Sequence, residues 1–196
     1  GAELGATTSI FETDHKTLEY LDFQGRSGDY LEIKADPDAH YDEKIVINLN
    51  DIVPMIAKPH SPDNVESISG VCGVKVNQVA IGSCTNSSYE DLTRAASILR
   101  NKKISNNVSL VIAPGSSSIL SMLAANGALS DLIDSGARIL ECGCGPCIGM
   151  GQAPNTNGVS LRTFNRNFKG RSGTDSAEIY LVSPESAAAS ALCGYI

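Results

Sequence analysis

The amino-acid sequence predicts an α/β fold, a layered domain built on a largely parallel sheet. From residue 78 onwards, short apolar runs of strand length alternate with longer segments of helical spacing. Glycine and proline residues mark several junctions between these segments. Strands that alternate with helices are typical of a parallel sheet whose crossovers are helical. The 196 residues suffice for one or two domains with a substantial core.

The first part of the chain differs from the rest by sparse periodicity and many acidic residues. Asp14–Leu21 is predicted to form a short helix, and the alternating, β-branched segment Lys44–Leu49 a strand. Two prolines with polar neighbours in residues 57–64 indicate a linker. We therefore expect two domains, residues 1–60 and 61–196.

The second part is predicted to alternate strands with helices. The expected strands are Gln78–Ile81, Val108–Ala113, Ala137–Leu140 and Glu178–Val182. The expected helices are Ser88–Arg100, Ser117–Leu132 and residues 183–192. Gly127 is expected to interrupt the second helix, and Ser87 with Glu90 fits a capping box at the start of the first. Residues 152–159 are expected to form a loop.

Composition excludes several classes of protein. The net charge of −7 argues against a general role at nucleic acids or membrane surfaces. No apolar run approaches the roughly 20 residues that span a bilayer. No basic segment precedes an apolar stretch as in a signal peptide, so we expect a cytoplasmic location. The sequence opens without Met, and we expect it to be a segment of a longer protein.

One stretch reverses the acidic character of the chain. Residues 142–174 contain no Asp or Glu, but they include Arg162, Arg166, Lys169 and Arg171. Such a stretch either binds an anion or forms a solvated basic loop, and charge alone does not choose between them. Arg162 is interpreted as a solvated or structural charge.

The cysteines carry the clearest chemical signal. Three of the six lie within six residues, at Cys142, Cys144 and Cys147. In a chain of this length without a secretion signal, such clustering indicates metal ligation or redox chemistry rather than a disulfide scaffold. Cys84 follows one predicted strand and the cysteine group follows another. Ligands gather at the carboxyl ends of parallel strands, so these thiols are expected to meet there.

Several alternatives exist for these thiols. The spacing of Cys144 and Cys147 is found in zinc ribbons, thioredoxin-like redox pairs and Fe–S sites. A zinc ribbon usually shows a second such pair, which is missing, and a redox pair does not explain Cys84. Three thiolates favour an Fe–S cluster with one open iron, which acts as a Lewis acid. Cys142 is an alternative third or fourth ligand, although its spacing favours a packing or supporting role.

The remaining cysteines and the histidines are expected to have no part in the chemistry. Cys72 and Cys193 are expected to be ordinary small buried residues. His15, His40 and His60 lie away from the cysteine motifs and are interpreted as surface or capping residues.

Four segments resemble the aconitase and isopropylmalate isomerase superfamily, and they occur in family order. Residues 81–87, IGSCTNS, resemble its first cluster-ligand signature, and residues 144–149, CGPCIG, its second, in the aconitase form. Residues 164–171, FNRNFKGR, resemble its substrate-binding segment. Residues 1–9 resemble a further active-site segment. The resemblance implies a three-layer αβα aconitase-type domain, preceded by the C-terminal part of a second α/β domain.

The resemblance also implies roles for individual residues. It implies that Cys84, Cys144 and Cys147 hold a 4Fe-4S cluster, with Asn165 beside the cluster and the substrate.

Three further residues complete the implied site. Arg166 and Arg171 would bind substrate carboxylates, because the planar guanidinium matches a carboxylate and stays charged. Glu3 would hydrogen-bond the substrate hydroxyl or bound water, where a carboxyl group can manage a proton.

The implied reaction is the reversible loss and re-addition of water that interconverts citrate and isocitrate through cis-aconitate. In the family, the catalytic base lies on a fourth domain. Neither that domain nor the first is matched here, so they are expected partners and the segment is expected to be inactive alone. The alternatives are homoaconitase, isopropylmalate isomerase large subunit, methylaconitate hydratase, or a non-catalytic Fe–S, zinc or RNA-responsive module. The negative charge argues against RNA.

Overall fold

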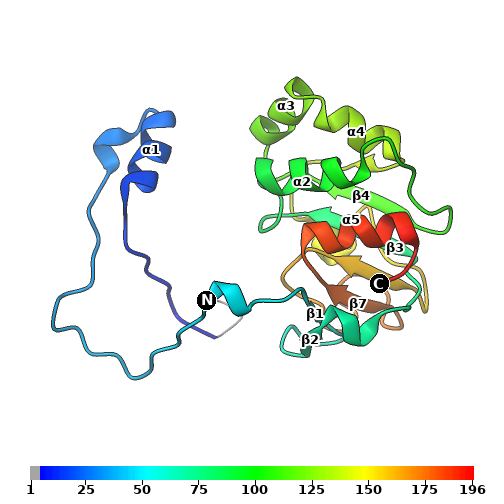
Figure 1. Ribbon diagram of the computed structural model, residues 1–196, viewed down its shortest axis with the longest axis horizontal. Helices are drawn as coiled ribbons and strands as arrows, with labels where there is room; N and C mark the ends of the chain where they lie inside the picture. The colour runs from blue at the N-terminus through cyan, green and yellow to red at the C-terminus, as the bar shows by residue number, and fades with distance from the viewer. Residues whose placement is uncertain (1–4) are drawn as a thin grey trace. The chain divides into compact units, whose positions relative to one another are not determined.

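A computed structural model describes residues 5–196 of the chain (Figure 1). The chain divides into two compact units, and the boundary between them falls between Ile52 and Val53. This boundary precedes the predicted linker, because residues 55–57 already belong to the sheet of the second unit.

The first unit contains one α-helix, α1 (His15–Phe23), and two 3₁₀ turns, η1 (Ser27–Asp29) and η2 (Leu49–Asp51), within its described residues. The Asp14 carboxylate accepts hydrogen bonds from the backbone N–H groups of Lys16 and Thr17, which fixes the start of α1 as predicted.

The strand predicted at Lys44–Leu49 is wrong. Its alternating side chains are exposed, and the described part of the first unit offers no strand for it to pair with. Without a partner, β propensity does not produce a strand.

The second unit is built on a seven-stranded sheet in the order β2-β1-β7-β6-β3-β4-β5. Its strands are β1 (Met55–Ala57), β2 (Val65–Ser67), β3 (Gln78–Gly82), β4 (Ser109–Ala113), β5 (Arg138–Ile139), β6 (Val159–Arg162) and β7 (Glu178–Leu181). The five strands from β7 to β5 are parallel, whereas β1 is antiparallel to both β2 and β7. The predicted α/β class with a largely parallel sheet is confirmed.

Two parts of this sheet differ from the sequence prediction. Residues 57–64 form no linker: they join β1 to β2 as a hairpin at one side of the sheet. The Asn167 amide donates to the Lys58 carbonyl oxygen at 2.8 Å, which ties the hairpin to the chain that follows β6. Strand β6 begins where the predicted loop was expected to end.

Four helices accompany the sheet: α2 (Tyr89–Leu99), α3 (Ser117–Ala125), α4 (Ala128–Ser135) and α5 (Pro184–Cys193). Gly127, at a φ of +83°, separates α3 from α4 as predicted. The capping box of α2 is formed by Ser88 and Asp91, not by Ser87 and Glu90. The Ser87 hydroxyl instead donates to the Ser83 carbonyl oxygen.

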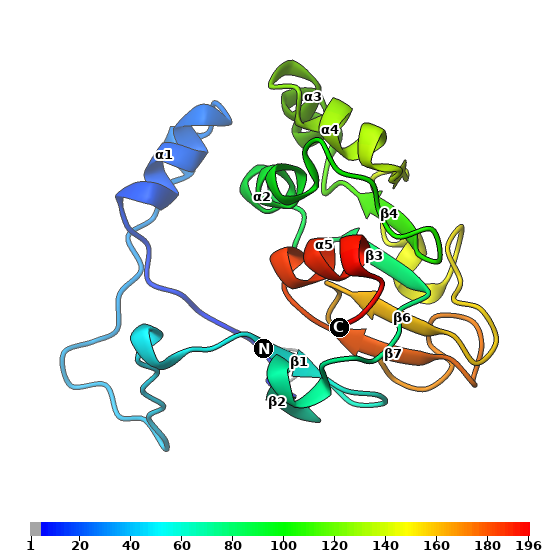
Figure 2. The same cartoon turned by 45° about the vertical axis from the view of Figure 1, so that its right-hand side comes forward.

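The two faces of the sheet are covered differently. Val79 and Ile81 of β3 belong to the main core with residues from α2 to α5, and Figures 1 and 2 show α2 and α5 side by side over this face. Successive side chains of a strand alternate between faces. Ala80 therefore faces the other way, where it packs with Val111 and Phe164 and against Cys147. The three layers are helices, sheet, and the loops that carry the cysteines.

The parallel register brings the carboxyl ends of three strands close together. Gly82 lies opposite Ala113, and Ala80 lies opposite Arg162, so β3, β4 and β6 end close together. The segments that follow β3 and β6 hold Cys84 and Asn165. The segment that follows β5 holds Cys142, Cys144 and Cys147. In the described part of the chain, no helix is long and apolar enough to cross a membrane.

Candidate functional site

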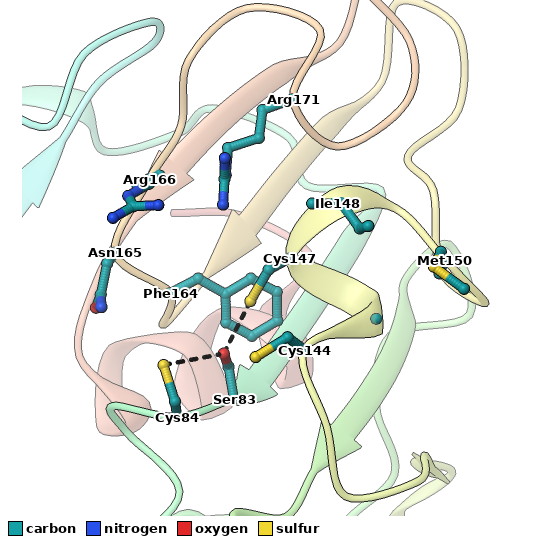
Figure 3. A pocket seen from close by; sticks show the side chains of 11 residues that line it. Ser83, Cys84, Cys144, Cys147, Ile148, Met150, Phe164, Asn165, Arg166 and Arg171 are labelled. Carbon is teal, nitrogen blue, oxygen red and sulfur yellow. Dashed lines mark hydrogen bonds between the residues drawn. The ribbon is translucent and has the colours of Figure 1, made fainter.

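A cavity of about 390 Å³ lies at the carboxyl ends of the parallel strands. It is lined by all six of the predicted site residues that the structure describes: Cys84, Cys144, Cys147, Asn165, Arg166 and Arg171. Figure 3 shows the three sulfur atoms gathered around Ser83, with the two guanidinium groups on the arginine-bearing loop across the cavity. Glu3, the seventh predicted residue, lies outside the described residues.

Cys84 is positioned by a sharp turn at the end of β3. Gly82 has a φ of +121°, and an added Cβ would lie 2.0 Å from the Ala113 carbonyl oxygen, so only glycine fits there. Ser83 follows with a φ of +74°, a conformation that residues with a side chain rarely adopt. Strained backbone of this kind concentrates at functional sites. The turn directs Cys84 into the cavity.

Cys144 and Cys147 are held by a tight turn after β5. The 3₁₀ turn η4 (Gly145–Ile148) has Pro146 in its first turn, and the Cys147 N–H donates to the Cys144 carbonyl oxygen at 3.1 Å. Gly149 ends the turn at a φ of +84°. An added Cβ on Gly149 would lie 2.1 Å from the Ser172 carbonyl oxygen, which shows how closely this turn approaches the chain that follows Arg171.

Ser83 connects the two cysteine motifs. Its hydroxyl lies 2.8 Å from the Cys147 sulfur, a hydrogen bond between residues 64 apart in sequence, and 3.9 Å from the Cys84 sulfur. Sequence analysis placed Ser83 in the first motif but gave it no role. The contact depends on which strands are neighbours, so the motif alone does not reveal it.

The other cysteines do not line this cavity. Cys142 is exposed and lines a smaller neighbouring cavity of about 130 Å³, together with Cys84 and Cys144. A role for Cys142 beside these two cysteines stays a prediction. Cys72 and Cys193 are exposed, so the expectation that they are buried is wrong.

The basic residues of the acid-free stretch take different positions. Arg166 and Arg171 are half-buried and line the cavity, whereas Lys169 is exposed and does not. No Asp or Glu is among the described lining residues. Two guanidinium groups that line one cavity can bind an anion there, because the planar fork of arginine donors matches a carboxylate.

The environment of Arg162 differs from one of the environments that the sequence suggested. Its side chain is fully buried, with 0% exposure, so of the two interpretations the solvated charge is wrong and the structural charge is right. Burial lowers its pKa to about 10, and a negative charge at Cys147 acts in the opposite direction. Its position at the end of β6 beside the cysteine turn was not expected, because β6 itself was not predicted.

The donor set fits an Fe–S cluster. Among residues 5–196, no three Cys, His, Asp or Glu side chains lie close enough to hold a single metal ion together. In a cluster of four irons, each thiolate binds a different iron, so the ligands stand apart around the cluster. Three thiols distributed around one cavity, with glycine-rich backbone beside them, suit such a group.

The fold and the cavity define a class of protein: an α/β protein whose ligand site lies at the carboxyl edge of a parallel sheet. The model of the aconitase family (aconitate hydratase) matches residues 1–75 and 70–194. The chain belongs to this family, as its four motifs predicted.

Several curated proteins are similar to the whole chain. The chain is 45% identical over 195 residues to the 3-isopropylmalate dehydratase large subunit 2 of Archaeoglobus fulgidus, covering 99% of this chain and 47% of that protein. It is 41% identical to the 3-isopropylmalate dehydratase large subunit 1 of Thermotoga maritima, with the same coverage. It is 44% identical to a probable methanogen homoaconitase large subunit of Methanosarcina mazei, covering 99% and 49%. The chain spans about half the length of these relatives.

Proposed function

We propose that this chain forms the cluster-binding part of the large subunit of a hydro-lyase of the 3-isopropylmalate dehydratase type. The observation that carries the proposal is the cavity, which gathers the six described residues to which the family resemblance assigns roles. The names of the similar proteins favour the alternative reading of the sequence over the citrate–isocitrate reaction. Homoaconitase is the second candidate, because one relative of 44% identity carries that name.

The walls of the cavity support the choice of substrate. Ile148, Met150 and Phe164 are the apolar side chains among the residues that line the cavity, apart from the cysteines. An apolar wall favours an apolar substituent such as an isopropyl group, because burying each CH₂ contributes about 0.8 kcal/mol.

Each polar residue then has a defined task. Arg166 and Arg171 bind the two carboxylates of the malate moiety through paired N–H donors. Asn165 offers an amide donor and acceptor at the mouth of the cavity. When bound, a 4Fe-4S cluster with three thiolate ligands supplies an open iron that polarises a hydroxyl group. Glu3 holds a proton near that hydroxyl, which is a prediction from the motif.

The proposal includes parts beyond this chain. The similar proteins are named large subunits, so we propose that a second subunit or domain supplies the catalytic base. The isolated chain is then inactive towards 3-isopropylmalate. A cytoplasmic location stays a prediction from the sequence.

The cluster is tested by replacing each thiol in turn. Cys84→Ser, Cys144→Ser and Cys147→Ser are reconstituted anaerobically with iron and sulfide, with Cys72→Ser as the matched control that lines no part of the cavity. We expect the wild type and the control to bind about four irons and four sulfides with the absorption and EPR spectra of the cluster. The three cavity variants should lose most of it. Zinc without sulfide in the anaerobically purified wild type would contradict the proposal.

The substrate is tested with the complete protein and its second subunit. The kcat/KM for dehydration of 3-isopropylmalate should exceed the kcat/KM for dehydration of citrate. A preference for citrate would return the assignment to the citrate–isocitrate reaction.

A further inference from the structure

Arg162 is a buried cation beside the cysteine-bearing turn. It is the last residue of β6, and its side chain is fully buried. Burying a charge is costly unless it is well hydrogen-bonded and paired.

The guanidinium group of Arg162 fastens the cysteine loop to the sheet. Its Nη1 donates to the Pro146 carbonyl oxygen at 2.6 Å, and its Nη2 donates to the Gln152 carbonyl oxygen at 3.0 Å. These two carbonyls stand on either side of the segment that closes the loop after Cys147. From the sheet side, Gln78 Oε1 accepts from Nη2 at 2.9 Å and Ser160 Oγ accepts from Nε at 2.9 Å.

None of the acceptors that the described residues offer to Arg162 is negatively charged. Two are backbone carbonyls, and the side chains are an amide and a hydroxyl. The ring of Phe164, which lines the cavity, lies 5.4 Å from the guanidinium carbon. Four of the five N–H donors of the guanidinium group are thus hydrogen-bonded, and none of these four bonds goes to a carboxylate. The acidic partner that would usually accompany it is also missing from residues 142–174.

The cysteine site provides the missing negative charge. Three thiolates carry more negative charge than the small net positive charge of the iron–sulfide core that they would bind, and Cys147 belongs to the same turn whose Pro146 carbonyl accepts from Arg162. We propose that Arg162 is a positioning residue that locks the Cys144–Cys147 turn onto the sheet and supplies a buried counter-charge to the thiolate-bound group. The counter-charge part rests on the proposed function, whereas the locking part stands on the hydrogen bonds alone.

The test separates charge from geometry with two substitutions in the complete protein. Arg162→Met removes both, whereas Arg162→Lys keeps the charge but cannot reach four acceptors with its single ammonium group. Arg94→Met is the matched control, because Arg94 is an exposed arginine of α2 that pairs with Glu90 and Glu185. Each protein is measured without iron and after anaerobic reconstitution.

Without iron, hydrogen exchange measures whether Arg162 holds the Cys144–Cys147 turn on the sheet. The Gly149 and Met150 amides donate within the turn, at 3.1 and 2.9 Å to the carbonyl oxygens of Pro146 and Gly145. We expect both amides to lose protection in Arg162→Met and Arg162→Lys but not in Arg94→Met. Wild-type protection in both Arg162 variants would overturn the locking role. If Arg162→Met does not fold, Arg162→Lys decides.

After reconstitution, the reduction potential reports on the charge. A positive charge near the cluster favours the added electron, so Arg162→Met should have a more negative potential than wild type, and Arg162→Lys should stay near it. Iron loss to a chelator should accelerate roughly tenfold or more in Arg162→Met. An unchanged potential and unchanged iron loss would overturn the counter-charge. If the wild type assembles no cluster, the proposed function fails. Hydrogen exchange then still decides whether Arg162 holds the Cys144–Cys147 turn in place.

Discussion

Gly149 shows how a single residue sets the width of the cavity. It lies between the cysteine turn and the chain after Arg171, and no side chain fits between its Cα and the Ser172 carbonyl. The contact keeps thiols and guanidinium groups on facing walls of one cavity.

Replacing Gly149 by Ala should therefore open the site. The left-handed φ alone costs about 1–2 kcal/mol, and the added Cβ must push the two segments apart. We expect a lower free energy of unfolding in urea and weaker iron retention after reconstitution. Gly143→Ala is the control, because Gly143 belongs to the same loop and has open space around its Cα. Equal effects of the two substitutions would refute the close contact as the cause.

Arg171 is predicted to bind a substrate carboxylate. Removal of a hydrogen bond to a charged group costs about 1.5–3 kcal/mol, so Arg171→Gln should lower kcat/KM by about 10- to 100-fold in the complete enzyme. Lys169→Gln is the control from the same loop, since Lys169 is exposed and lines no part of the cavity. Steady-state kinetics with 3-isopropylmalate checks this, and an equal loss in the control would point to the net charge of the loop instead.

Among the elements, α1 depends on its N-cap residue Asp14 more than on its packing. None of its residues is buried, so the helix lacks the apolar contacts that usually stabilise one. The backbone hydrogen bond from Thr17 lowers the pKa of the Asp14 carboxyl, and the one from Lys16 acts in the same direction.

The start of α1 should accordingly be sensitive to acid. Because the folded-state pKa is lowered, the stabilisation is present above the ordinary carboxyl pKa of about 4 and is lost as pH falls through the lowered value. The amide NMR shifts of Lys16 and Thr17 should follow this titration. Asp14→Ser keeps a capping oxygen that does not titrate, so its amide shifts should be insensitive in that range. The same midpoint in both proteins would exclude the cap as its origin.

At the scale of the whole molecule, the second unit contains both hydrophobic clusters. Every residue of the two clusters lies at or beyond Ile56. The first unit exposes Ile45, Val46 and Ile47 and contributes to neither.

A fragment of residues 53–196 should thus fold by itself. We expect cooperative urea unfolding and amide NMR shifts for β3, β4 and β6 that match those of the full chain. A fragment that begins at residue 61, the boundary expected from the sequence, loses β1 and should be less stable. An unfolded 53–196 fragment would show that the first unit is needed for the core.

The sequence predicted the apolar strands and the cysteine site better than it predicted β6 and the β1–β2 hairpin. Apolar runs such as Gln78–Ile81 predict strands directly, and two strand ends in a parallel sheet predict that Cys84 and Cys147 meet. Strand β6 escaped prediction because it contains buried Ser160 and Arg162, whose polar partners come from Gln78 on the neighbouring strand. The β1–β2 hairpin escaped because strands of three residues are too short to show a period.

The hydrogen bond between Ser83 and Cys147 has a consequence for the maturation of this protein. It spans 64 residues and needs β3 and the cysteine turn after β5 to be in place. Contacts between distant residues form late, because the chain must first lose the entropy of closing long loops. The three thiols therefore converge only once the sheet exists. On the proposed function, insertion of the cluster would therefore follow the folding of the sheet.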